Sequence, residues 1–547
     1  MKKIFSLLIT AALLAGCSNT AAEVTTAVPL SPETAPAQQT QLSEFTAPAY
    51  VSRFDTVTEI ILSDDGINID DSTKADVVFE SRDIIYYEDR DTYESGNPYG
   101  DGTAADKHTA EEAAAHTVVN ITAPGAYRIT GKLSAGQIRV DLGDDAYEDP
   151  KAVVELILDN ADITCTVAPA ILFLNTYECD GNWSTDSAKP DVDTSAAGAN
   201  LILEGNNTVS GSYVAKIFKD KDGEKKLWKQ DGAIYSYMSM NVFGPGGLEL
   251  NASNEGLDTE LHLTINGGNI TINADNDGIN TNEDGVSVTT INAGNLTIFA
   301  GLGAEGDGID SNGYLVINGG NVISCAKPIS DAGLDSDLGS FIHGGTVIAM
   351  GSSMDWAESE SGQVTMNLQF ASRQPAGSKI TVTREDGTEI FSVEDDGPNS
   401  RGFSGLILSH AAFTQGETYH VYVDGVQMAY TGTDVMRGPG GFGGRPGDFD
   451  PQNMPENFDP GKMPEGFDSG KMPEGFDPSQ MGNPGSRPEG GNMIPPEGFD
   501  GKFPEGAEPP QMPDGNFGNR GDIPAGEPST AFYMNDMVNF FSGVTSA

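Results

Sequence analysis

The chain has 547 residues, and its 81 Asp and Glu side chains outnumber its 30 Lys and Arg side chains, which gives a formal net charge of −51 at pH 7. Such acidity opposes binding to nucleic acid, or to any other polyanion, by direct charge pairing. Only bridging cations would let this surface hold an acidic polymer. The charge suits a soluble extracellular surface, and we expect a monomer that does not bind nucleic acid.

Residues 1–17 have the pattern of a bacterial secretion signal. A basic start precedes the apolar run Ile4–Leu14, and Leu-Ala-Gly-Cys ends it at Cys17. This ending is typical of a lipobox, where the signal is cut before Cys17 and the thiol is acylated; the alternative is an ordinary signal peptide with a chance cysteine. Residues 18–48, rich in Thr, Ala, Pro and Gln, would then tether a protein anchored by lipid to the bacterial cell membrane and displayed at the cell surface.

Short apolar strands separated by polar turns predict a β cap over residues 49–117. The pattern becomes regular over residues 118–352, where the segments NEGLDTE, NDGINTN, GDGIDSN and DAGLDSD are nearly alike. Their central glycines lie 22, 30 and 25 residues apart, at Gly256, Gly278, Gly308 and Gly333. A period in the twenties with β-branched strands and Gly/Asn turns is typical of solenoids.

We therefore predict an all-β fold built on a right-handed parallel β-helix of about seven coils. Alternation of apolar and polar residues along each strand indicates that one face of the strand is buried. The side chains expected to point inward are Ile265, Ile272, Ile279, Ile291, Ile298, Ile309, Ile317 and Leu334.

Stacking of the repeats would align their acidic residues in rows, because neighbouring strands lie about 4.8 Å apart. The rows are Glu255, Asp277 and Asp307, ended by Ala332; Asp258, Asn280, Asp310 and Asp335; and Glu260, Asn282, Asn312 and Asp337. Between residues 231 and 372 the only Lys or Arg is Lys327. Hard oxygen ligands without a protein counter-charge suit Ca²⁺. The predicted ligands are Glu255, Asp258, Asp277, Asn280, Asp307, Asp310, Asp335 and Asp337; the alternative is that these residues only make solvated turns.

The chain changes character after the repeats. Residues 364–432 read as antiparallel strands, with a hairpin turn at Glu385–Gly387, and predict a small β-sandwich-like cap. Residues 435–530 repeat Pro, Gly, Met and Phe in motifs such as KMPEGFD. This composition indicates a disordered spacer, although the Met and Phe side chains could also contact a partner. In the final segment, 531–547, residues 531–541 could form a short apolar helix.

Two features have no assigned role. Cys165, Cys179 and Cys325 match no zinc spacing, and the sequence leaves open whether Cys165 and Cys179 form a disulfide. The insertion at residues 216–229 holds the one strongly basic patch of the chain.

The order of several segments resembles a bacterial carbohydrate-binding domain known from a cellulolytic clostridium. They are AYRITGKLSAGQIRVDL, VELILDNADIT, PAILFLN, DGAIYSYM and INGGNITINADNDGIN, and the resemblance covers roughly residues 115–430. It implies a parallel β-helix shaped like a pectate lyase, bound Ca²⁺, and binding to cellulose and acidic plant polysaccharide. The basic insertion and the PEGFD motifs depart from the family.

The sequence is compatible with three functions. The first is a non-catalytic, Ca²⁺-dependent protein that binds cellulose or acidic pectic glycan, with no catalytic residues. The second is an enzyme acting on polygalacturonate. A lyase needs a base, and the repeats offer only Lys327; a hydrolase could draw its carboxyl pair from Asp277, Asp307 and Asp310, but the Arg-x-Lys pair of such enzymes is absent. The third is a structural or adhesive surface protein without a sugar ligand.

Overall fold

The computed structural model describes eight ranges of the chain: 49–87, 107–181, 187–218, 226–328, 330–352, 355–394, 402–433 and 527–547. The predictions for the secretion signal with Cys17, for the tether 18–48 and for nearly all of the segment 435–530 lie outside these ranges. Within them the fold is all-β apart from one short α-helix and two 3-10 turns. None of the described helices has the length and apolar character needed to cross a membrane.

Parallel strands from distant parts of the sequence form an eight-stranded sheet. The strands are β3 (Val78–Ser81), β4 (Thr117–Ile121), β6 (Gly136–Asp141), β8 (Ile171–Asn175), β13 (Gly232–Ser236), β16 (Glu255–Thr259), β18 (Ile279–Thr281) and β20 (Ile309–Ser311). All neighbours pair in parallel except β3 and β4. The helix α1 (Ala110–Ala115) leads into β4 from a capping box at Thr109.

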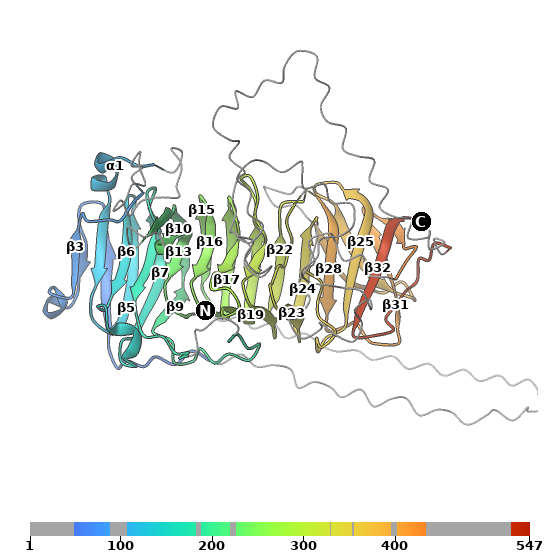
Figure 1. Cartoon of the computed structure of the whole chain (residues 1–547), viewed down its shortest axis with the longest axis horizontal. Coiled ribbons are helices and arrows are strands. Elements are labelled where there is room, and N and C mark those ends of the chain that lie inside the picture. Colours follow the sequence, from blue (N-terminus) through green and yellow to red (C-terminus); the bar gives the residue numbers. More distant parts are fainter. Residues whose placement is uncertain are drawn as a thin grey trace, which may run out of the picture. The chain divides into compact units, whose positions relative to one another are not determined.

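A second, mixed sheet contains the remaining long strands (Figure 1). Its first part consists of β1 (Val57–Leu62), β2 (Asn68–Ile69), β5 (Gly125–Leu133), β7 (Val154–Thr164), β9 (Ala199–Glu204), β10 (Asn206–Gly211), β14 (Met240–Phe243), β15 (Gly247–Ala252), β17 (Leu263–Ala274), β19 (Val288–Phe299), β21 (Tyr314–Ile317), β22 (Asn321–Cys325), β23 (Gly339–Ile342) and β24 (Thr346–Gly351). The basic insertion forms a separate two-stranded ladder of β11 (Val214–Phe218) and β12 (Lys226–Gln230).

The prediction of a right-handed parallel β-helix is wrong. Six parallel strands pair in a closed ring, β7–β9–β14–β17–β15–β10, while many strands lie outside this ring and the eight-stranded sheet is separate. The ring closes because β7 and β17 are long enough to pair with two different strands along one edge. In β17, Leu263–Ile265 pairs with β14 and Asn269–Ala274 pairs with β15. Gly268, at φ +100°, bends β17 between these two halves without ending it.

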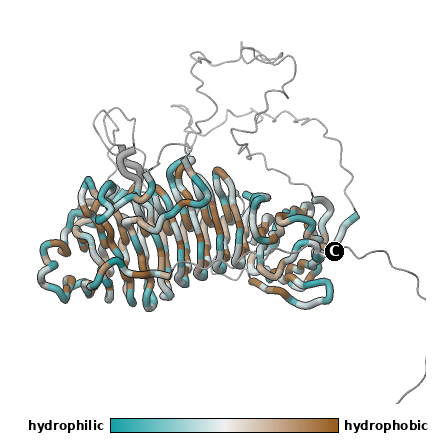
Figure 2. The backbone as a smooth tube through the Cα atoms, turned by 90° about the horizontal axis from the view of Figure 1, so that it is seen from below, coloured by the Kyte–Doolittle hydropathy of each residue, from teal (hydrophilic) through white to brown (hydrophobic). Residues whose placement is uncertain are grey.

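The burial predicted from the repeats is confirmed although the architecture is not. All eight side chains expected to point inward are fully buried in one hydrophobic core, and Leu257, Ile279 and Ile309 lie in register on successive strands. In Figure 2 apolar and polar residues alternate along the strands. The alternation therefore predicted which face is buried, since side chains of a strand point to opposite faces in turn.

The C-terminal strands surround a second core. They are β25 (Thr365–Gln374), β26 (Lys379–Arg384), β27 (Glu389–Glu394), β28 (Phe403–His410), β29 (Thr418–Val423), β30 (Val426–Ala429), β31 (Phe532–Tyr533) and β32 (Val538–Ser546). Most pairs are antiparallel, and β24 joins them through β28. The hairpin at Glu385–Gly387 is confirmed by the pairing of β26 with β27.

The helix predicted within residues 531–541 is wrong. This segment contributes β31 and the start of β32, and β32 pairs in parallel with β25. Phe532, Phe541 and Val544 are buried in the second core. Pairing with a distant strand thus overrides the local apolar pattern, which is ambiguous in so short a run.

Candidate metal site

The candidate site lies where four parallel strands, β13, β16, β18 and β20, stack their acidic ends. Tyr235, Asp258, Asn280 and Asp310 occupy equivalent positions on these strands. Asp335 follows one layer further, because its amide donates to the carbonyl of Ile309 at 2.8 Å. The alignment of the second predicted row is therefore present in the backbone register.

The first predicted row is joined by hydrogen bonds that run from layer to layer. The amide of Asp307 donates to Oδ1 of Asp277 at 2.7 Å, and the amide of Ala332 donates to Oδ1 of Asp307. Each of these carboxylates thus receives a backbone donor from the next layer. One oxygen of each carboxylate, Oδ1, is thereby bound to the backbone of the next layer.

Burial divides the eight predicted ligands into two groups. Glu255, Asp258, Asp277 and Asn280 are all less than 10% exposed. The later residues, Asp307, Asp310, Asp335 and Asp337, are partly or fully exposed. The row consequently runs from a buried end at β16 toward an accessible end beyond β20.

The third row behaves differently from the other two. The side-chain Nδ2 of Asn282 donates to Oδ1 of Asp258. The side-chain Nδ2 of Asn312 donates to the backbone carbonyl oxygen of Asn282 at 2.7 Å. Glu260 accepts a short hydrogen bond from the hydroxyl of Tyr235. These contacts hold Glu260, Asn282 and Asn312 in place beside the second row.

The stacked carboxylates raise one another's pKa values. Burial raises the pKa of Asp277 well above its usual range, and the charges of Glu255, Asp310 and Asp307 raise it further. Burial also raises the pKa of Asp307, with the next largest contribution from Asp335. Like charges brought together in a poorly solvated place oppose ionisation, and either protons or a bound cation would relieve this repulsion.

Two buried oxygen atoms of the site have no hydrogen-bond partner among the described residues. They are Oε2 of Glu255, whose side chain is 4% exposed, and Oδ1 of Asn280. An unpartnered buried oxygen is costly unless it has a ligand. Carboxylate and amide oxygens are the ligands that Ca²⁺ prefers, so these residues fit the ion that the sequence predicts.

Two acidic residues of the site were not predicted from the sequence. Asp231 lies with Glu255 and Asp258 such that one oxygen of each falls within 4.8 Å of the others. Burial and Asp335 raise the pKa of Asp355 to about 7, and the amide of Ser336 donates to its Oδ2 at 3.1 Å. The Asp231-Gly232 pair at the start of β13 was a usable signal, because it introduces a segment aligned with the later repeats. Asp355 follows the last repeat and carries no such signal.

The remaining sequence candidates take structural roles. The ammonium group of Lys327 donates to the carbonyl oxygens of Gly303, at 2.8 Å, and Ala304. Among the described residues Cys165 and Cys179 do not form a disulfide with each other.

The comparisons with known proteins agree with a carbohydrate-related role. A protein of Acetivibrio thermocellus described as a carbohydrate-binding domain-containing protein is 31% identical over 153 residues, which make up 28% of this chain and 43% of that protein. The chain thus matches less than half the length of this curated relative. The solved structure titled as a polysaccharide lyase-like protein from C. thermocellum, gadolinium derivative, is 21% identical, with a TM-score of 0.30 over 53% of this chain and 94% of that one. A family model described as carbohydrate-binding domain-containing protein matches residues 115–406. Since this range is more than half of the 547 residues, the chain belongs to the family of carbohydrate-binding domain-containing proteins.

Proposed function

We propose that this protein is a non-catalytic surface lipoprotein that binds plant cell-wall polysaccharide, cellulose or acidic pectic glycan, with the help of Ca²⁺. The observation that carries the proposal is the row of stacked carboxylates that begins at Glu255, whose buried Oε2 has no protein partner in the described chain. Membership of the family supports binding to carbohydrate, and the row of carboxylates supports binding of the cation.

The energetic case for the cation rests on repulsion within the row. Two carboxylates about 5 Å apart repel by roughly 3 kcal/mol at an effective dielectric constant near 20. The hydrogen bonds described for the Lys327 ammonium group go to backbone carbonyl oxygens rather than to these carboxylates. Ca²⁺ shared by neighbouring layers would replace repulsion by attraction.

The same ions would give an acidic protein a way to hold an acidic glycan. At the accessible end of the row Asp307 and Asp310 are partly exposed. Ca²⁺ takes six to eight oxygen ligands, so an ion held there by two or three protein oxygens keeps positions for a uronate carboxylate.

Two observations restrict the catalytic alternatives. A lyase base must be free to take a proton, whereas Nζ of Lys327 donates hydrogen bonds to two backbone carbonyl oxygens. For a hydrolase, the carboxyl pair must reach the glycosidic bond; of the three candidates Asp277 is buried and its Oδ1 accepts from the amide of Asp307, which leaves Asp307 and Asp310 as the accessible pair.

The proposal is tested by depletion from solution with insoluble cellulose and with immobilised polygalacturonate, with and without 1 mM Ca²⁺. We expect retention on polygalacturonate that disappears in EGTA and in the double variant Asp277→Asn, Asp307→Asn. The matched control is Asp386→Asn in the exposed hairpin between β26 and β27. Release of unsaturated uronates or of reducing ends would contradict a non-catalytic role, and failure to retain the protein on any polysaccharide would leave the structural or adhesive alternative.

The anchor is tested separately. We expect Cys17→Ser to abolish incorporation of labelled fatty acid and to release the protein from the membrane fraction or leave an uncleaved precursor. Unchanged membrane retention after normal cleavage would contradict lipid anchoring.

A further inference from the structure

A cleft that shares no lining residue with the acidic row lies against strands of the mixed sheet. It has a volume of about 430 Å³ and is lined by Tyr50, Phe243, Pro245, Ile202, Glu204 and Asn266. A volume in this range is typical of sites for small ligands. The lining combines two aromatic rings with a carboxylate and an amide.

The aromatic wall is built by two segments far apart in the sequence. The rings of Tyr50 and Phe243 have centroids 5.4 Å apart at an interplanar angle of 41°. Both rings pack against a small apolar cluster with Phe54, Ile157 and Ile202, and both remain partly exposed. They therefore form a rigid apolar surface that is accessible to a ligand.

The position of Tyr50 is fixed by a buried carboxylate. Glu155, 1% exposed, accepts hydrogen bonds from the Tyr50 hydroxyl at 2.7 Å, from Ser52 Oγ at 2.5 Å and from the amide of Arg53 at 2.7 Å. Burial and then Glu155 raise the pKa of the Tyr50 hydroxyl, so it stays a neutral donor. The ring is held in place before any ligand arrives, which lowers the entropy cost of binding.

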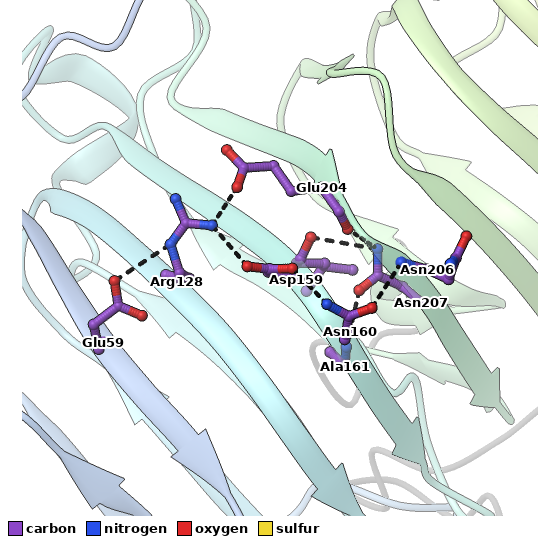
Figure 3. Close-up of polar contacts among 9 residues, drawn as sticks. Glu59, Arg128, Asp159, Asn160, Ala161, Glu204, Asn206 and Asn207 are labelled. Carbon is purple, nitrogen blue, oxygen red and sulfur yellow. Dashed lines mark hydrogen bonds and ion pairs between the residues drawn. The ribbon is translucent and has the colours of Figure 1, made fainter. Parts of the chain in front are cut away.

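The polar side of the cleft is fixed as well. One carboxylate oxygen of Glu204 pairs with Arg128, which also contacts Asp159 at 3.1 Å and Glu59 at 3.3 Å (Figure 3). Three carboxylates around one guanidinium group leave a net negative charge beside the cleft. A uronate would be repelled there, whereas the hydroxyl groups of a neutral sugar can donate to a carboxylate.

The side-chain amide of Asn266 is the first in a row of hydrogen-bonded asparagine side chains that continues beyond the cleft. Asn292 donates to Asn266 at 2.8 Å and Asn318 donates to Asn292 at 2.9 Å. A parallel ladder joins Asn269, Asn295 and Asn321, whose side chains are exposed. A bound sugar chain that extends past Asn266 would meet further amide groups.

We propose that this cleft is a subsite for a neutral hexopyranose unit of a polysaccharide chain. The flat apolar face of a pyranose ring stacks on the wall of Tyr50 and Phe243, and its hydroxyl groups bond to Glu204 and Asn266. The inference deepens the proposed function and rests on it, but the cleft uses no cation. The inference assigns the two classes of glycan to two different sites. The cleft binds the neutral chain, and the acidic row binds the charged chain through Ca²⁺.

The test is titration calorimetry of the full-length chain with cellobiose, cellohexaose and hexagalacturonate, each with and without EGTA. We expect cellohexaose to bind more tightly than cellobiose and to be unaffected by EGTA. Phe243→Ala should weaken cellohexaose binding about tenfold, the usual effect of losing one aromatic contact. Phe243→Leu, which keeps the apolar volume, should have nearly the same effect, and Tyr533→Ala, a ring that is 49% exposed elsewhere, should have none.

Unchanged cellohexaose affinity in both Phe243 variants, with their melting temperature preserved, would overturn the subsite. If hexagalacturonate still bound in a Ca²⁺-dependent way, the proposed function would stand without the cleft. Cellohexaose binding that depends on Phe243, combined with no binding of hexagalacturonate, would instead support the cleft and contradict the calcium bridge.

Discussion

The stability of the metal-free protein should fall as the pH rises from about 4 to 7. Asp277, Asp307 and Asp355 all have pKa values that folding raises. Between the unfolded and the folded pKa the folded state binds more protons than the unfolded state, so its stability decreases as the pH rises through this window. The stabilising protonated form is complete only below the unfolded pKa, near 4.

The size of this loss of stability can be calculated from the pKa of Asp355. Folding raises the pKa of Asp355 from 3.8 to about 7, which at about 1.4 kcal/mol per pH unit corresponds to about 4 kcal/mol lost by pH 7. A protein of roughly 350 folded residues should then melt about 5 °C lower, given an unfolding entropy of about 2 cal/mol/K per residue. Asp277 and Asp307 change the stability in the same direction.

Calcium should remove this slope, because an ion bound by the carboxylates replaces the protons. The assay is differential scanning calorimetry of chelator-treated protein at pH 4.5, 5.5, 6.5 and 7.5, without metal and with 1 mM Ca²⁺. At a concentration one hundred times its Kd the ion adds about 2.7 kcal/mol. Asp277→Asn with Asp307→Asn keeps the oxygen acceptors for the amides of Asp307 and Ala332 and should reduce both the pH slope and the calcium effect.

Two results would refute this reasoning. The first is a metal-free melting temperature that stays flat or rises between pH 4.5 and 7.5. The second is a calcium effect of equal size in the double variant and in the wild-type chain.

Three further predictions concern the fold. Ile279→Ala should cost about 3 kcal/mol in the free energy of unfolding, because the side chain is fully buried, while Val426→Ala, 48% exposed, should cost less than about 0.5 kcal/mol by denaturant titration; equal losses would contradict the assigned core. Removal of residues 538–547 should abolish hydrogen-exchange protection in β25 and β30, which pair with β32, and retained protection would show that these strands are stable alone. Arg128→Met should lower the free energy of unfolding by about 2 kcal/mol, because it leaves three neighbouring carboxylates without their guanidinium partner; an unchanged stability in denaturant titration would contradict this role of Arg128.

The sequence predicted local features better than pairings. The repeat steps of 22 and 30 residues placed Leu257, Ile279 and Ile309 in register, because residues that bury one face of a strand recur at a fixed place in each repeat. The closed ring escaped prediction, since it depends on whether β17 continues through Gly268, and a glycine can equally well end a strand. Neither Asp355 nor the pairing of Tyr50 with Phe243 has a local signal, because each depends on chain segments brought together only in the folded state.

The parallel pairing of β32 with β25 has a consequence for the order of synthesis. At about 5 to 20 residues per second, β32 leaves the ribosome roughly 10 to 30 s after β25. Joining the two also closes a connection of more than 100 residues, at an entropy cost of about 4 kcal/mol. During that interval the edge of β25 and the side chains that later cover Phe541 and Val544 are open to other chains. A chain that stops short of residue 538 should therefore expose an unpaired strand edge that the complete chain covers.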